Sequence, residues 1–102
     1  MKSANSNHQA LRSEMKTLWE ESDAIWDSEQ NEPAYELFVS ADYELVFDTL
    51  IELRDKTESF LELGSGLGVI TIMASRLGYN AFGIEAKSKL IDQSVELSLI
   101  HI

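Results

Sequence analysis

The feature that most constrains the fold is a run of alternating glycines in mid-chain, Glu62-Leu63-Gly64-Ser65-Gly66-Leu67-Gly68. We call residues 64–68 the glycine loop. A short apolar segment, residues 59–63, precedes it, and its length and flanks favour a buried strand. Residues 69–77 after it have the pattern of a helix. Glycine permits positive φ and close approach of a ligand, and a helix start offers free N–H groups. The sequence therefore predicts that a polar or anionic ligand group binds there.

A second strand and a last helix are predicted further along. Gly78 directly follows the predicted helix over 69–77, at the position where helices often end with a residue in the left-handed conformation. Residues 81–85 form another short apolar strand, and Ser88 is expected to cap a helix whose packed face carries Leu90, Ile91 and Val95. The order strand, glycine loop, helix, strand, helix predicts two parallel strands joined by a right-handed crossover.

Two helices are predicted before the first strand. The first runs from about Gln9 to Asp27, after a frayed polar start, with apolar residues at Leu11, Met15, Leu18, Trp19, Ile25 and Trp26. This apolar stripe either packs on its own domain or docks a partner. The second helix covers 43–53, follows the aromatic segment 35–39 and has Ser40 as its expected cap. We divide the chain into a polar tail with an amphipathic helix, 1–32, and an α/β part, 33–102.

Composition narrows the possible functions. The 102 residues suit one small domain, and the absence of cysteine excludes disulfides and cysteine-ligated metals. His8 and His101 have no partner at metal-ligand spacing, so we expect both to be exposed near the chain ends and predict no metal site. The net charge of −10 disfavours nucleic acid as a partner. Because the chain has neither a secretory signal nor a long apolar run, we expect a cytoplasmic protein that does not enter a membrane.

An acidic residue completes the candidate site. Glu85 ends the second predicted strand, about 20 residues after Gly64, where nucleotide-binding units place a carboxylate on the ribose hydroxyls. Loss of such a charged hydrogen bond costs about 1.5–3 kcal/mol, or roughly 10- to 100-fold in affinity. The alternatives are a purely structural glycine loop and a solvated carboxylate at a strand end.

The spacing of the glycines indicates the ligand. Dinucleotide sites favour G-x-G-x-x-G, but the third glycine here, Gly68, comes one residue early, and Glu62 precedes the first by two. The pattern resembles motif I of class I S-adenosylmethionine-dependent methyltransferases. Residues 60–71 and 83–85 look like that family's first strand–helix–strand unit, and residues 35–53 are more weakly similar to the segment before it, so about the last two-thirds of the chain resembles the family. The resemblance implies the α/β class: an incomplete Rossmann-like, doubly wound parallel sheet preceded by two helices.

The resemblance also implies roles for individual residues. The cofactor is S-adenosyl-L-methionine, and Glu62 is expected near the amino end of its methionine. Glu85 is expected to hold the ribose, and Ala86 to border the adenine. Tyr35 or Phe38 covers the cofactor or, as the alternative, packs in the core. Backbone of the glycine loop lines the methionine and ribose, through Gly64, Ser65, Gly66 and Gly68.

Other functions stay open at this point. The first is an NAD- or FAD-dependent oxidoreductase, although a carboxylate such as Glu62 would repel a pyrophosphate and suits a cationic sulfonium. The second is a non-catalytic module that docks a partner through its first helix. The resemblance leaves the methyl acceptor and the catalytic residues unidentified. It also implies a larger sheet, so we expect this chain to be the N-terminal part of a longer enzyme. Alone, the chain is expected to be inactive and marginally stable. Residues 97–102 are expected to mark a truncation or a read-through into non-coding sequence.

Overall fold

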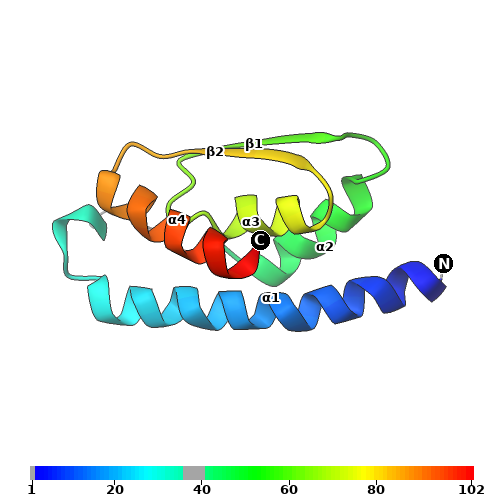
Figure 1. Ribbon diagram of the computed structural model, residues 1–102, viewed down its shortest axis with the longest axis horizontal. Helices are drawn as coiled ribbons and strands as arrows, with labels where there is room; N and C mark the ends of the chain where they lie inside the picture. The colour runs from blue at the N-terminus through cyan, green and yellow to red at the C-terminus, as the bar shows by residue number, and fades with distance from the viewer. Residues whose placement is uncertain (1, 36–40) are drawn as a thin grey trace.

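The chain folds into stacked layers, with a two-stranded sheet on one side and helices beneath it (Figure 1). The structure is a computed structural model that describes residues 2–35 and 41–102, with side chains from His8 onward. The strands β1 and β2 are parallel, and their register runs from Ser59 opposite Asn80 to Leu63 opposite Ile84. The fold is therefore mixed α/β, with the elements α1 (Lys2–Glu29), a 3₁₀ turn (Pro33–Tyr35), α2 (Tyr43–Leu53), β1 (Ser59–Leu63), α3 (Val69–Arg76), β2 (Asn80–Ile84) and α4 (Ser88–His101).

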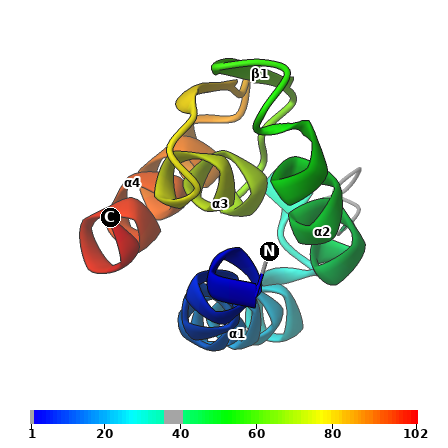
Figure 2. The same cartoon turned by 90° about the vertical axis from the view of Figure 1, so that its right-hand side faces the viewer.

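Helix α3 is the centre of the packing. It contacts both strands and each of the other three helices, and Figure 2 shows it lying between the sheet and α1. Its apolar residues Ile72, Met73 and Ala74 are buried. A helix that is only eight residues long is marginal by itself, so these tertiary contacts stabilise it.

The stripe on α1 packs against its own domain, as the first of the two alternatives predicted. Met15 and Leu18 are completely buried in the main core. Trp19 meets the ring of Phe47 on α2 edge-on, with the ring centroids 6.1 Å apart. The helix begins at Lys2 instead of near Gln9 and ends two residues later than predicted. No proline or glycine interrupts the sequence before Gln9, and extending an existing helix adds a hydrogen bond for each residue fixed.

The predicted bounds of α2 are confirmed, but its predicted cap is wrong. Asp42 is the N-cap, and its side chain accepts a hydrogen bond from the Leu45 N–H at 3.2 Å. Ser40 lies outside the described residues. An aspartate placed directly before the first helical residue can reach the free N–H groups of the first turn, which explains why it serves as the cap.

Helix α4 also differs from its prediction in two respects. Lys87 is the N-cap and makes no side-chain cap, while Ser88 is already the first helical residue. The buried face carries Leu90, Leu97 and His101, and both Ile91 and Val95 are exposed. His101 is only 8 % exposed, and its Nε2 lies 2.9 Å from a Glu21 carboxylate oxygen on α1. Both histidines were expected to be exposed; that expectation is wrong for His101, which is buried, and for His8, which is half-buried.

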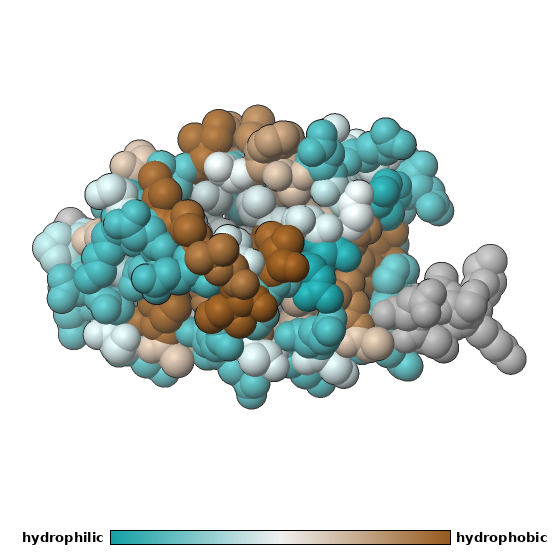
Figure 3. Space-filling model, in the orientation of Figure 1, coloured by the Kyte–Doolittle hydropathy of each residue, from teal (hydrophilic) through white to brown (hydrophobic). Residues whose placement is uncertain are grey.

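Apolar side chains gather on two outer surfaces. Figure 3 shows them over the sheet and along α4. On the sheet they are Leu61, Leu63, Phe82 and Ile84, which alternate with the inward-facing residues of their strands. The expectation of a buried first strand was therefore wrong for one of its faces, and β2 begins and ends one residue earlier than predicted. In the part of the chain that the structure describes, the helices pack on the opposite face of this sheet (Figure 1). Among the same residues, no helix combines the length and apolarity needed to cross a membrane.

Two leucines of α4 test its observed orientation. Leu97 is 4 % exposed and Leu99 is 80 % exposed, so they form a matched pair on one helix. We expect Leu97→Ala to lower the free energy of unfolding by about 2–5 kcal/mol, because it leaves a cavity. Leu99→Ala should change it by less than about 0.5 kcal/mol. Urea unfolding followed by circular dichroism measures both, and equal effects would contradict the assigned face.

Candidate ligand-binding site

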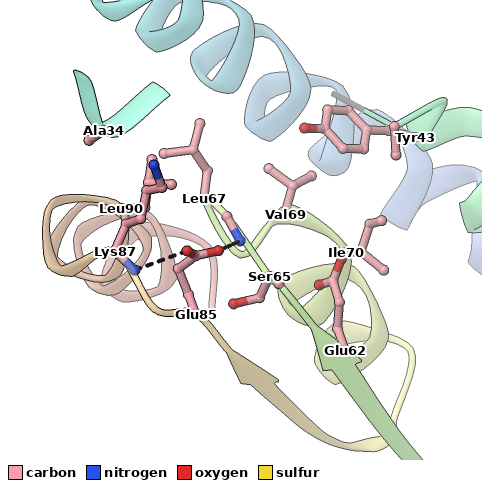
Figure 4. Close-up of a pocket in the computed structure, with 13 residues that line it drawn as sticks. Ala34, Tyr43, Glu62, Ser65, Leu67, Val69, Ile70, Glu85, Lys87 and Leu90 are labelled. Carbon is pink, nitrogen blue, oxygen red and sulfur yellow. Dashed lines mark hydrogen bonds between the residues drawn. The ribbon is translucent and has the colours of Figure 1, made fainter. Parts of the chain in front are cut away.

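A cavity of about 310 Å³ opens where both strands end, within the size range of small-molecule sites (Figure 4). Its floor is the glycine loop and the first turn of α3. Its walls come from the strand ends, the start of α4 and the segment before α2. The lining residues are Ala34, Ala41, Tyr43, Glu62, Gly64, Ser65, Gly66, Leu67, Val69, Ile70, Glu85, Lys87 and Leu90.

The glycine loop has the backbone conformation that its sequence predicts. Gly64, Gly66 and Gly68 have φ values of 71°, 56° and 78°, in the left-handed region that favours glycine. The N–H groups of Gly64 and Ser65 both donate to the carbonyl oxygen of Ile84, at 2.8 and 2.9 Å. These bonds join the ends of the two strands, and α3 begins immediately afterwards at Val69. The first turn of α3, whose N–H groups have no acceptor within the helix, lies beside the cavity through Val69 and Ile70.

Glu85 lies one residue beyond β2 and lines the cavity. Its Oε1 accepts a hydrogen bond from the Gly66 N–H at 2.8 Å, and its Oε2 accepts one from the Lys87 N–H at 3.0 Å (Figure 4). The carboxylate is thus held across the gap between the glycine loop and the start of α4. An ionised carboxylate has about four acceptor positions, so each oxygen retains capacity for a ligand hydroxyl.

Glu62 approaches the same cavity from β1. Its Oε1 accepts a hydrogen bond from the Thr71 hydroxyl at 3.0 Å. The N-cap of α3 is Gly68, which has no side chain, so Glu62 supplies an acceptor at this helix start from another element. Burial raises the pKa of Glu62 above 4.5, and the charge of Glu85 raises it further, while the hydrogen bonds from Thr71 lower it. Keeping this carboxylate ionised therefore opposes folding.

Three of the predicted site residues lie away from the cavity wall. Tyr35 is 1 % exposed and donates a hydrogen bond from its hydroxyl to Gln93 on α4, as the core-packing alternative expected. Gly68 is buried where α3 meets α4, and a Cβ there would come within 3.0 Å of the Ser94 Cβ. Ala86 is exposed beyond the cavity lining. Phe38 lies outside the described residues.

Other residues of the site were not identified from the sequence. The aromatic ring beside the cavity belongs to Tyr43, eight residues after Tyr35, and Lys87 and Leu90 of the α4 start also line it. Gly83 is a further omission: a Cβ on it would lie 2.7 Å from the Thr71 hydroxyl and 2.8 Å from the Ser65 Cβ. A glycine inside a strand is a signal for such close packing.

Comparison with known proteins adds no relative. No protein-family model matches the chain, and neither a curated protein nor a solved structure gives a significant match.

The pKa of Glu62 predicts an unusual stability profile. Because the folded chain binds this proton more tightly than the unfolded chain, the contribution of Glu62 to stability falls as the pH rises from below 4.5 through the raised pKa. Glu62→Gln keeps an acceptor for Thr71 and removes the charge. We therefore expect the unliganded variant to be more stable than wild type at neutral pH, with a smaller difference in acid.

Urea unfolding near pH 4 and near pH 7 measures this effect. Glu96→Gln, on the exposed surface of α4, is the matched control for removing one negative charge from a chain of net charge −10. A Glu62→Gln variant that is less stable than wild type at neutral pH would contradict the prediction.

Proposed function

We propose that this chain forms the S-adenosylmethionine-binding part of a class I methyltransferase with a Rossmann-like sheet. The observation that carries the proposal is the meeting of three features at one cavity: the glycine loop, the start of α3 and the Glu85 carboxylate. The carboxyl ends of parallel strands are where α/β proteins bind nucleotides. In this arrangement Glu85 binds the ribose hydroxyls while its existing hydrogen bonds keep it in place.

The charge of the cavity favours a cationic ligand over a dinucleotide. Its lining holds two acidic residues and one basic residue, Lys87, so its formal charge is negative. Glu62 and Glu85 are close enough for the charge of Glu85 to raise the pKa of Glu62. A pyrophosphate placed between them would be repelled, whereas an ammonium or sulfonium group would be attracted. A cation beside Glu62 also favours its ionised form and offsets the unfavourable burial. These points support S-adenosylmethionine over NAD or FAD as the ligand.

In this proposal the wall residues have the roles that the resemblance to the methyltransferases implies. Backbone of Gly64, Ser65 and Gly66 lines the methionine and ribose, and Glu62 binds the amino group. The bound cofactor supplies an electrophilic methyl group for direct transfer to an acceptor. The chain contributes by orienting that group, since positioning accounts for much of the rate in such displacements. The acceptor and the groups that bind it are not assigned.

A binding comparison distinguishes the proposed ligand from its main rival. We expect isothermal titration calorimetry of the 102-residue chain to detect S-adenosylhomocysteine binding and no NAD binding. Binding of NAD without any response to S-adenosylhomocysteine would favour the oxidoreductase alternative. A chain that responds to neither nucleotide would favour a non-catalytic module.

Removal of the Glu85 carboxylate tests its role. Glu85→Ala loses the acceptor for the ribose hydroxyls, so S-adenosylhomocysteine affinity should fall about 10- to 100-fold. Glu96→Ala removes the same charge from an exposed part of α4, away from the cavity, and should bind as wild type does. Calorimetry measures both dissociation constants, and similar affinities for Glu85→Ala and wild type would place the ribose elsewhere.

A further inference from the structure

The hydroxyl of Thr71 makes a contact that the proposed function does not explain. Thr71 lies in the first turn of α3 and donates its hydroxyl proton to the Glu62 carboxylate at 3.0 Å. Glu62 lines the cavity, but Thr71 is not part of the lining. Any influence of Thr71 on a ligand therefore passes through the position of Glu62.

The neighbouring strand makes room for this hydroxyl. Gly83 lies opposite Glu62 in the register of the sheet. A Cβ at position 83 would come within 2.7 Å of the Thr71 hydroxyl oxygen, and within 2.8 Å of the Ser65 Cβ, closer than atoms can approach without movement. Any larger residue would push Thr71 away from Glu62 or displace the glycine loop. The absence of a side chain at 83 and the hydrogen bond at 71 are independent observations of one packed unit.

The hydrogen bond from Thr71 restricts the orientation of the Glu62 side chain before a ligand binds. A glutamate side chain has several rotatable bonds and loses considerable freedom when it is ordered. The Thr71 hydroxyl holds one carboxylate oxygen against the start of α3, and the Thr71 backbone N–H also hydrogen-bonds this carboxylate. The two donors together select one orientation before a ligand arrives, and the hydroxyl is the one that a substitution can remove. A carboxylate held in advance binds a cation with less loss of conformational entropy.

We propose that Thr71 is a positioning residue that orients Glu62 toward the amino group of the ligand. In this role it sets the preference of the site for a nucleoside that carries an amino acid group over the same nucleoside without one. The inference rests on the proposed function, and it adds a specificity determinant outside the cavity wall.

Two ligands and two substitutions test the role of Thr71. S-Adenosylhomocysteine carries the amino acid group and 5′-methylthioadenosine lacks it, while both share the adenosine. We expect Thr71→Val to weaken S-adenosylhomocysteine binding about tenfold and to leave 5′-methylthioadenosine binding unchanged. Thr71→Ser keeps a hydroxyl, so it should keep the wild-type preference for S-adenosylhomocysteine over 5′-methylthioadenosine. Thr49→Val is the matched control, because the Thr49 hydroxyl donates to the Leu45 carbonyl on the exposed side of α2, at 2.9 Å, away from the cavity.

A double-mutant cycle with Glu62 separates positioning from a general effect on folding. In a Glu62→Gln background, Thr71→Val should have little further effect on the ratio of the two affinities. Urea unfolding measures whether each variant is folded and how stable it is. If Thr71→Val does not fold, Thr71→Ala takes its place. Equal weakening of both ligands, or failure of Thr71→Ser to keep the wild-type ratio, would overturn the inference alone. Failure of the wild-type chain to bind either ligand would overturn the proposed function with it.

Discussion

The site depends on one backbone junction, where the N–H groups of Gly64 and Ser65 share the carbonyl oxygen of Ile84. These two bonds connect the end of β1 to the end of β2, at the point where the chain changes direction before α3 begins. They set the distance between Glu62 and Glu85, and they direct the first turn of α3 toward the cavity. The positive φ angles of the loop make this crossing possible, since most other residues would be strained in this conformation.

The two carboxylates at this junction each serve the fold and the candidate site. Glu85 accepts the N–H groups of Gly66 and Lys87, and Glu62 accepts the Thr71 hydroxyl beside the uncapped start of α3. These donors belong to the glycine loop, the start of α4 and the first turn of α3, so the two carboxylates join three parts of the chain. Burial nevertheless raises the pKa of Glu62, so its charge is kept at a cost in stability. Such a cost is common where residues are selected for binding, and a cationic ligand would offset it.

The errors in predicted burial have a common physical origin in helix packing. The sequence shows that α4 has an apolar stripe, but it does not show which residues of the stripe contact another helix. The burial of Leu97 and His101 depended on the positions of α1 and α3. Tyr35 and Tyr43 are both aromatic residues in the part of the chain that precedes β1. Only the path of the chain decides that Tyr35 bonds Gln93 in the core while Tyr43 lines the cavity.

Local patterns in the sequence were sufficient for the positions of the strands to within one residue, the bounds of α2 and the positive φ of the glycine loop. They also placed Glu62 and Glu85 at the same end of the sheet, but they did not predict the exposure of one face of β1, which was expected to be buried. The properties predicted correctly depend on residues near one another in the chain, on period and on glycine's freedom of rotation. The tertiary structure alone decided the Thr71–Glu62 contact, the space at Gly83 and the hydrogen bonds that fix Glu85. Each of these requires atoms from separate elements to meet within about 3 Å, and such distances are set by packing and not by sequence spacing.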